Sequence, residues 1–404
     1  MQLSRADCKS DRVLCKNAKN ACTRYRLSQF LIRSVKESDL EDLLRLSRLV
    51  YFINLPDDRD ILKEKILTSV QSFNGILEDK FKRKYIFVIE DLKAQKVIGT
   101  SMIIARHGSP ESPHMYLELN EIQKYSETIH AGFIHKVLRL KFESDGPTEI
   151  GGLVIDPAYR GHAGKLGRQL SFARFLFIKM RRRWFKDRIL SELMPPLGEN
   201  GESILWESLG RKFTNLSYQD ADLLSRKNKE FITSLFPKGD IYTVLLPGEA
   251  RDAIGRVGKA TEPVKHMLEQ IGFRWKGHID PFDGGPHYWA DTDKISIIHN
   301  TRKASLNKET LKRKPKEAAL VGYLMNDEFY CLQTPYEFFR GTVLLPKSSI
   351  EDLNLPKKTQ LFVMPLEVVS NANQPMPTRF RSFPAFSPQE SSLNNLSASE
   401  ASSN

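Results

Sequence analysis

The sequence has few cysteines and no long apolar run, and each shortage excludes a class of protein. Only four of its 404 residues are cysteine, at Cys8, Cys15, Cys22 and Cys331. Such scattered thiols do not make a disulfide framework, and residues 1–40 hold no histidine to complete a metal site. No apolar run approaches the ~18 residues of a membrane span, and the N-terminus lacks a secretory signal. We therefore expect a cytoplasmic protein with reduced thiols, no metal ligands and no membrane partner.

Composition indicates a globular chain, and its charge is unevenly distributed. The apolar share is 40% and the charged share 27%, with a net charge of +12. Most of that excess lies in residues 1–29 and in residues 302–316, each of which holds seven basic residues. A nucleic-acid surface is usually a basic face of the folded domain itself. A nucleic-acid partner is therefore not favoured, although Arg181–Arg183 and Lys312–Lys314 keep it as a third hypothesis.

Hydrophobic periodicity begins at Phe30 and vanishes near Asn371, where Ser, Asn and Pro dominate. The predicted parts are a disordered basic N-terminal extension (1–29), two α/β regions (30–185 and 186–301), a basic linker (302–317), a small β module (318–369) and a disordered tail (370–404). The β module is expected because four short β-rich runs follow one another. These runs are Val321–Met325, Phe329–Gln333, Gly341–Leu345 and Gln360–Met364.

The first α/β region predicts the order strand, helix, helix, hairpin, strand, long helix. The predicted segments are strand Phe30–Val35, a helix opened by a capping box at Ser38–Glu41, helix Ile61–Phe73, the hairpin strands Lys84–Glu90 and Val97–Ala105, strand Glu149–Ile155 and a helix from Leu166 to about Arg183. Further on, Leu205–Phe213 and Met267–Trp275 look alike, as two corners at which a Gly ends a helix before a strand. Internal duplication is a hypothesis that rests on this likeness.

The loop between Ile155 and the long helix is the most informative stretch for chemistry. It places unpaired backbone N–H groups at the positive end of a helix dipole, where a phosphate binds well. Glycines allow close approach of an anion, and basic side chains add charge. The candidate phosphate-binding residues are Arg160, Gly161, Gly164, Lys165, Gly167 and Arg168. On the loop alone, these residues are equally well explained as a turn with solvated charges.

The element order resembles the GNAT acyltransferase fold, in which a pyrophosphate loop follows the fourth strand. Collinear motifs downstream resemble arginine N-succinyltransferase more closely. These motifs are Leu55-Pro56, Ser171–Ile178, Trp206-x-x-Leu209-Gly210-Arg211-x-Phe213, Ala221-Asp222, Ile241-Tyr242-Thr243, Ala253-Ile254-Gly255-x-Val257, Thr261-x-Pro263, Leu268-Glu269-x-x-Gly272-Phe273 and Asp280-x-Phe282-Asp283-Gly284-Gly285-Pro286. The resemblance covers about residues 30–365. It implies an α+β fold with a mixed central sheet flanked by helices.

The resemblance also implies an activity, the transfer of succinyl from succinyl-CoA to the α-amino group of L-arginine in arginine catabolism. Residues 30–185 would then bind acyl-CoA, and residues 186–301 would complete the site. Succinyl-CoA is expected as co-substrate, with no permanently bound cofactor. Leu153 and Ile155, on the strand before the loop, are expected to contact it. The partners expected are these small molecules, and an oligomer is left open.

One departure from the family concerns proton transfer, because Gly258 stands where the family has its proton-donor His. His266 and Tyr242 are the candidate substitutes, and His278 and His287 are further candidates near the Phe-Asp-Gly-Gly-Pro motif. For the substrate, Glu192 and Asp283 are candidate partners of the guanidinium group, and Arg174 and Arg211 are candidates for a carboxylate. Because Gly258 cannot transfer a proton, a catalytically lapsed acyl-CoA or arginine-binding module is the alternative function.

Overall fold

The computed structural model describes residues 29–49, 55–225, 228–311, 317–353, 355 and 359–366. The predicted N-terminal extension, apart from residue 29, and the predicted tail from residue 370 lie outside the described residues. So do Cys8, Cys15, Cys22 and Lys312–Lys314. No helix in the described ranges is long and apolar enough to cross a bilayer.

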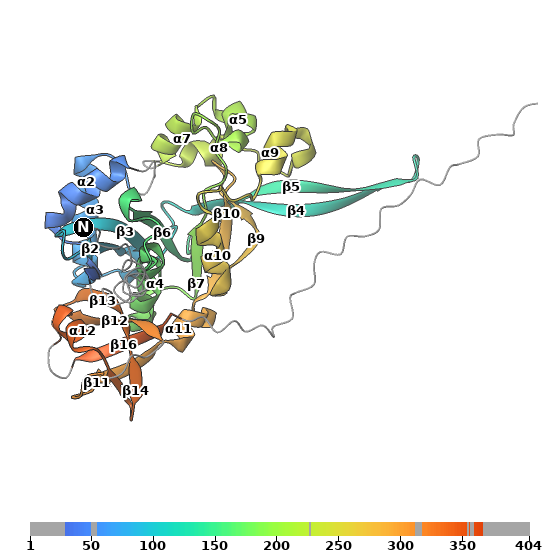
Figure 1. Cartoon of the computed structure of the whole chain (residues 1–404). Coiled ribbons are helices and arrows are strands. Elements are labelled where there is room, and N and C mark those ends of the chain that lie inside the picture. Colours follow the sequence, from blue (N-terminus) through green and yellow to red (C-terminus); the bar gives the residue numbers. More distant parts are fainter. Residues whose placement is uncertain are drawn as a thin grey trace, which may run out of the picture. The chain divides into compact units, whose positions relative to one another are not determined.

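The described strands form one mixed sheet (Figure 1). In spatial order they are β14 (Glu337–Phe339), β15 (Thr342–Leu344), β11 (Arg302–Leu306), β16 (Gln360–Pro365), β12 (Ala318–Met325), β13 (Glu328–Pro335), β1 (Phe30–Ser34), β2 (Lys84–Asp91), β3 (Lys96–Ile104), β6 (Thr148–Ile155), β7 (Arg188–Glu192), β10 (Pro286–Asp291), β9 (Arg274–Ile279), β4 (His114–Ser126), β5 (Ala131–Glu143) and β8 (Ile241–Tyr242). The predicted β2–β3 hairpin is confirmed by its antiparallel register. Figure 1 shows β4 and β5 projecting as a long two-stranded arm.

Helices pack against both faces of the sheet and at one of its ends. They are α2 (Leu40–Arg48), α3 (Arg59–Phe73), α4 (Leu166–Met180), α5 (Ile204–Ser208), α6 (Gly210–Thr214), α7 (Tyr218–Ser225), α8 (Glu230–Leu235), α9 (Gly248–Ala253), α10 (Glu262–Gln270), α11 (Ser296–Asn300) and α12 (Lys347–Asp352). Side chains alternate along β2, so that Ile86 and Val88 pack against α2 and α3 while Phe87 and Ile89 pack against α4. Helices α5 to α9 cover β4, β5 and β9 with a separate apolar cluster around Trp206.

The start of α2 differs from the predicted capping box. Ser38 lies inside a short 3-10 turn, and α2 begins at Leu40 without a side-chain cap. The Asp39 carboxylate instead accepts a hydrogen bond from the Lys36 N–H at 2.8 Å, and Asp39 also pairs with the buried Arg33 guanidinium. The acidic residue next to Ser38 is the better acceptor here because it satisfies a buried cation as well as the backbone.

The predicted basic linker (302–317) is wrong at its start, because Arg302–Leu306 is strand β11. Ala304 is buried between β15 and β16, while Arg302 and Lys303 lie over the aromatic rings of Phe338 and Phe362. Basic residues therefore cover apolar surface with their stems and keep their charges in solvent. The strands predicted for the β module continue the same sheet, since β13 pairs with β1.

The two look-alike corners differ in the structure, so the likeness behind the duplication hypothesis does not hold. Gly272, at φ +114°, ends α10 before β9 as expected. Gly210 instead begins α6, directly after α5. A Cβ at Gly210 would lie 2.2 Å from the Trp206 ring, so close packing requires a glycine there.

Candidate functional site

The sheet opens between β6 and β7, which are parallel neighbours only at their first residues. Thr148 pairs with Ile189 and Glu149 with Leu190, and no pairing follows in the described strands. The other edge of β6 carries a bulge, because its register with β3 shifts between Thr100 and Met102. Gly152 in this bulge has φ +58°, which favours glycine. Leu153 follows it, beyond the last residue of β6 that pairs with β7, so the predicted CoA-contacting residue lies beside the opening between the two strands, which we name the β6–β7 mouth.

Arg174 supports the bulge from α4. Its side chain is 2% exposed, and its guanidinium donates to the Gly151 carbonyl at 3.1 Å and to Ser171 Oγ at 2.7 Å. Burial lowers the pKa of Arg174 to about 9, and no carboxylate pairs with it among the described residues. The structure therefore places this residue behind β6, where it fixes the strand, and the prediction that it binds a substrate carboxylate does not fit.

The predicted phosphate loop lies between β6 and the N-terminus of α4. The backbone N–H groups of Gly161, Ala163, Leu166 and Gly167 donate no hydrogen bond within the described part of the chain. Arg160 and Lys165 are exposed on the same loop. Four unpaired donors at the positive end of a 15-residue helix would suit an anion, and we name this stretch the anion cradle. Arg168 is partly removed from it, because its guanidinium donates to the Leu366 carbonyl and lies over Phe172.

The Ile-Gly-x-Val segment and the Phe-Asp-Gly-Gly-Pro turn, which are separate in sequence, meet at the end of β7. The Gly258 N–H donates to the Met194 carbonyl at 2.9 Å, and the Leu193 N–H donates to the Pro286 carbonyl at 3.1 Å. The Gly255 N–H donates to the Gly284 carbonyl at 3.0 Å. The turn after β7, the Ile-Gly-x-Val segment and the Phe-Asp-Gly-Gly-Pro turn therefore form one wall of the β6–β7 mouth.

Gly258 has no room for a side chain. A Cβ built there would lie 2.7 Å from the Pro195 carbonyl oxygen, which is backbone and cannot rotate away. The φ of Gly258 is not positive, so the need for glycine comes from this close approach alone. Any larger side chain at position 258, an imidazole included, would therefore clash with the backbone of Pro195.

Two of the predicted carboxylates lie at this wall. Glu192 ends β7, and burial followed by the charge of Glu149 raises its pKa to about 8. Asp283 lies in the turn between β9 and β10, where burial and the charge of Asp280 raise its pKa well above the usual range. Asp283 Oδ1 also accepts the Gly285 N–H at 2.7 Å. A nearby cation would stabilise the ionised form of a carboxylate whose pKa is raised. These two side chains therefore suit a cationic ligand.

Glu192 faces a group of histidines on the sheet surface opposite α4. His287 is its direct cross-strand partner, and His287 Nε2 lies 3.5 Å from Glu192 Oε1. His114 Nδ1 lies 4.0 Å from the same oxygen. His107 stacks edge-on against His114 and is bonded to Glu149. The sequence pointed to His287 through its neighbouring turn, but nothing in the spacing of His107 and His114 could have placed them here.

The structure does not bring the remaining candidates to the mouth. Tyr242 lies on edge strand β8, with four strands between it and β7. Arg211 pairs on the surface with Glu207 at 2.7 Å. His266 is exposed on α10, whose packing residues are Val264, Met267 and Leu268. Neither predicted substitute for the proton donor is therefore positioned for that role.

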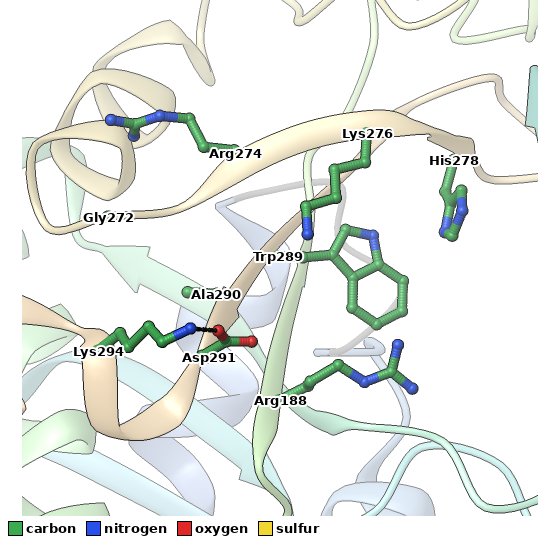
Figure 2. A pocket seen from close by; sticks show the side chains of 9 residues that line it. All are labelled: Arg188, Gly272, Arg274, Lys276, His278, Trp289, Ala290, Asp291 and Lys294. Carbon is green, nitrogen blue, oxygen red and sulfur yellow. Dashed lines mark hydrogen bonds and ion pairs between the residues drawn. The ribbon is translucent and has the colours of Figure 1, made fainter. Parts of the chain in front are cut away.

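A hollow near the other end of β7 is lined by basic residues (Figure 2). Trp289 lies between Lys276, His278 and Arg188 in this view, and Arg188 stacks on its indole ring at 5.3 Å. Lys294 pairs with Asp291 at 2.6 Å. Because Arg188 begins β7 and Glu192 ends it, this hollow is separate from the β6–β7 mouth.

A bulged strand, a parallel neighbour that diverges from it and an anion cradle at the next helix define an acyltransferase of the GNAT fold. Residues 30–297 match the family described as arginine N-succinyltransferase beta subunit. The chain belongs to this arginine N-succinyltransferase family.

Curated relatives and a solved structure agree with this assignment. An arginine N-succinyltransferase of Photorhabdus laumondii is 33% identical over 306 residues, 75% of this chain and 88% of that protein. One from Yersinia pestis is 33% identical over 278 residues, 68% of this chain and 78% of that protein. The arginine/ornithine succinyltransferase subunit AI of Pseudomonas aeruginosa has the same fold, with a TM-score of 0.73 and 24% identity over 84% of this chain and 99% of that one.

Proposed function

We propose that the protein transfers the succinyl group of succinyl-CoA to the α-amino group of L-arginine. The observation that supports this most directly is the β6–β7 mouth, which has an anion cradle on the α4 side and half-buried carboxylates at the wall. The cradle suits the pyrophosphate of CoA, and the carboxylates suit a guanidinium. A cytoplasmic location remains a prediction from the sequence.

The proposed reaction joins the arginine α-nitrogen to the thioester carbon and breaks the carbon–sulfur bond. The ammonium must first lose a proton, and the departing CoA thiolate takes one up. At the bulge of β6, the backbone of Leu153 would offer an N–H to the thioester oxygen as negative charge develops on that oxygen. Asp283 would hold the guanidinium, and Arg174 would keep the bulge in place. Thiolate is a good leaving group, so proton uptake from solvent is compatible with turnover despite Gly258.

The decisive assay measures thiol release from succinyl-CoA with a panel of amines. We expect release that depends on L-arginine, with formation of N-succinylarginine detected by mass spectrometry. Acetyl-CoA in place of succinyl-CoA tests the acyl donor. Binding of succinyl-CoA and arginine by calorimetry without any thiol release would contradict the proposal and favour the lapsed binding module.

The anion cradle predicts the effect of a bulky residue at Gly164. A Cβ there would lie 3.1 Å from His162 Nδ1 and 3.3 Å from Gln169 Nε2, two side chains that hold the loop. Gly164→Val is expected to weaken CoA binding about tenfold or more, since at least one charge-assisted hydrogen bond to phosphate is lost. Calorimetry with CoA measures it. Gly239→Val is the matched control, because a Cβ at Gly239 meets no atom within 4 Å; equal affinities in the two variants would reject the cradle.

The packing around Gly258 predicts that the family histidine cannot simply be restored. Gly258→His is expected to lower the free energy of unfolding by about 1–3 kcal/mol, the usual cost of overpacking, with no gain in rate. Thermal melts and thiol release measure the two effects. Gly258→Ala introduces the same Cβ without the imidazole and should lose similar stability. A His variant as stable as the parent, and faster with a pH dependence near 6.5, would contradict this account.

A further inference from the structure

Three polar groups from three strands face one another behind the wall of the mouth. Glu192 ends β7, His287 lies opposite it on β10, and His114 begins β4. The Glu192 oxygen that lies 3.5 Å from His287 Nε2 is the one that lies 4.0 Å from His114 Nδ1. A fourth group, His107, brings a ring nitrogen to within 4.8 Å of the polar atoms of His114 and Glu192.

The two central histidines are buried without any hydrogen bond. His114 is 1% exposed and His287 is fully buried, and all four of their ring nitrogens lack a partner in the described part of the chain. A buried polar group without a partner costs about 1–3 kcal/mol, so native proteins rarely keep one for no purpose. Two of these four atoms, His114 Nδ1 and His287 Nε2, lie within 4.0 Å of one Glu192 oxygen.

The spacing of these atoms fits a shared cation better than direct hydrogen bonds. Separations of 3.5 and 4.0 Å are too long for an N–H···O bond. His107, His114 and Glu192 each offer a ligand atom within 4.8 Å of the other two, a set that a small shift of the side chains would bring onto one tetrahedral ion. His287 does not join this set, because its ring stacks on that of His114 with the centroids 5.3 Å apart.

A second carboxylate orients His107, as is common for a metal-bound histidine. Its Nδ1 is bonded to the buried Glu149 carboxylate, which leaves Nε2 free. A carboxylate that orients a histidine in this way is common behind metal ligands. Asp280 also faces Glu192, but its Oδ1 accepts the N–H groups of Phe282 and Asp283, so we assign it to the turn.

We propose that His107, His114 and Glu192 bind one divalent transition-metal ion of the Zn²⁺ class. Two imidazoles and one carboxylate suit Zn²⁺ and its first-row neighbours, whereas Mg²⁺ and Ca²⁺ prefer sites made of oxygen alone. The ligands come from β4, β7 and the loop before β4, so the ion would tie β4 to β7. His114 and His287 also pack around Trp289, the indole of the basic hollow in Figure 2. The proposal does not depend on succinyl transfer.

Metal binding is measured on the full chain after treatment with EDTA and dialysis. We expect one Zn²⁺ per chain by titration calorimetry and elemental analysis, a raised melting temperature with Zn²⁺, and visible absorption bands when Co²⁺ replaces it. Mg²⁺ and Ca²⁺ should not compete. If the parent binds no more Zn²⁺ than the double variant His107→Asn/His114→Asn, the proposal is overturned.

Single variants locate the site. His114→Asn and Glu192→Gln are each expected to lower Zn²⁺ affinity about 100-fold or more, since one metal ligand is lost. His299→Gln, at an exposed position on α11, is the matched control and should bind as the parent does. Circular dichroism confirms folding, and Glu192→Gln, nearly isosteric, serves if His114→Asn does not fold. Unchanged Zn²⁺ affinity in folded Glu192→Gln would overturn the site even if arginine is succinylated normally.

Discussion

Asp283→Asn is expected to raise the KM for arginine about 10–100-fold while the KM for succinyl-CoA stays unchanged. Asp283 is one of two predicted guanidinium partners, and the other, Glu192, is directed toward histidines. Asn keeps the oxygen that accepts the Gly285 N–H, so the turn should survive and only the charge is removed. A charge-assisted bond to a guanidinium in a closed site contributes about 1.5–3 kcal/mol, which gives the size of the effect.

A comparison of two amine acceptors tests whether Asp283 recognises the charge of the guanidinium group. Citrulline has the shape of arginine but a neutral ureido group, so the parent should prefer arginine and Asp283→Asn should lose most of that preference. A preference for arginine that is unchanged in the variant would show that another group binds the guanidinium.

A pH profile adds an independent test of the same carboxylate. Burial and the charge of Asp280 raise the pKa of Asp283 in the free protein. Arginine binds the ionised form, so kcat/KM for arginine should rise with pH across that raised pKa and be lost below it. Asp283→Asn should remove this step from the profile.

Local patterns predicted most elements of residues 30–185, but not the long β4–β5 hairpin. Two β-rich runs joined by a short polar link predicted the β2–β3 hairpin, and the glycines with their flanking charges predicted the loop before α4. These features depend on neighbours in sequence, so periodicity and turn chemistry are enough to find them. The motif around Asp283 was found through the family resemblance, and the structure places it in the turn between β9 and β10.

Features made by distant strands could not be predicted in this way. His107, His114 and His287 meet only because β4 and β10 lie near each other in a sheet whose order does not follow the chain. The need for glycine at position 258 comes from the Pro195 carbonyl, which no local pattern reveals. Strand β11 was missed because its basic residues resemble a linker until the aromatic rings beneath them are known.

Arg174 belongs to a family motif, but we expect it to affect the reaction indirectly, by holding the bulge of β6 in place. Arg174→Met is expected to lower kcat about 10–100-fold, because the bulge of β6 loses the donor that fixes Gly151 and a small misplacement of the reacting groups has effects of this size. The free energy of unfolding should stay the same or rise, since Arg174 is a buried cation without a carboxylate partner and Met fills a similar volume.

Arg33 is the comparison for Arg174, because the two buried arginines differ in whether a carboxylate pairs with them. It is also buried, but it pairs with Asp39 at 2.7 Å and with Glu90 at 2.8 Å. Arg33→Met leaves these carboxylates unpaired and should cost about 3–5 kcal/mol of stability. Urea unfolding and steady-state kinetics on both variants test the pair of predictions. An Arg174→Met protein that is destabilised like Arg33→Met, or that keeps full kcat, would show that Arg174 does not position the strand that faces the thioester.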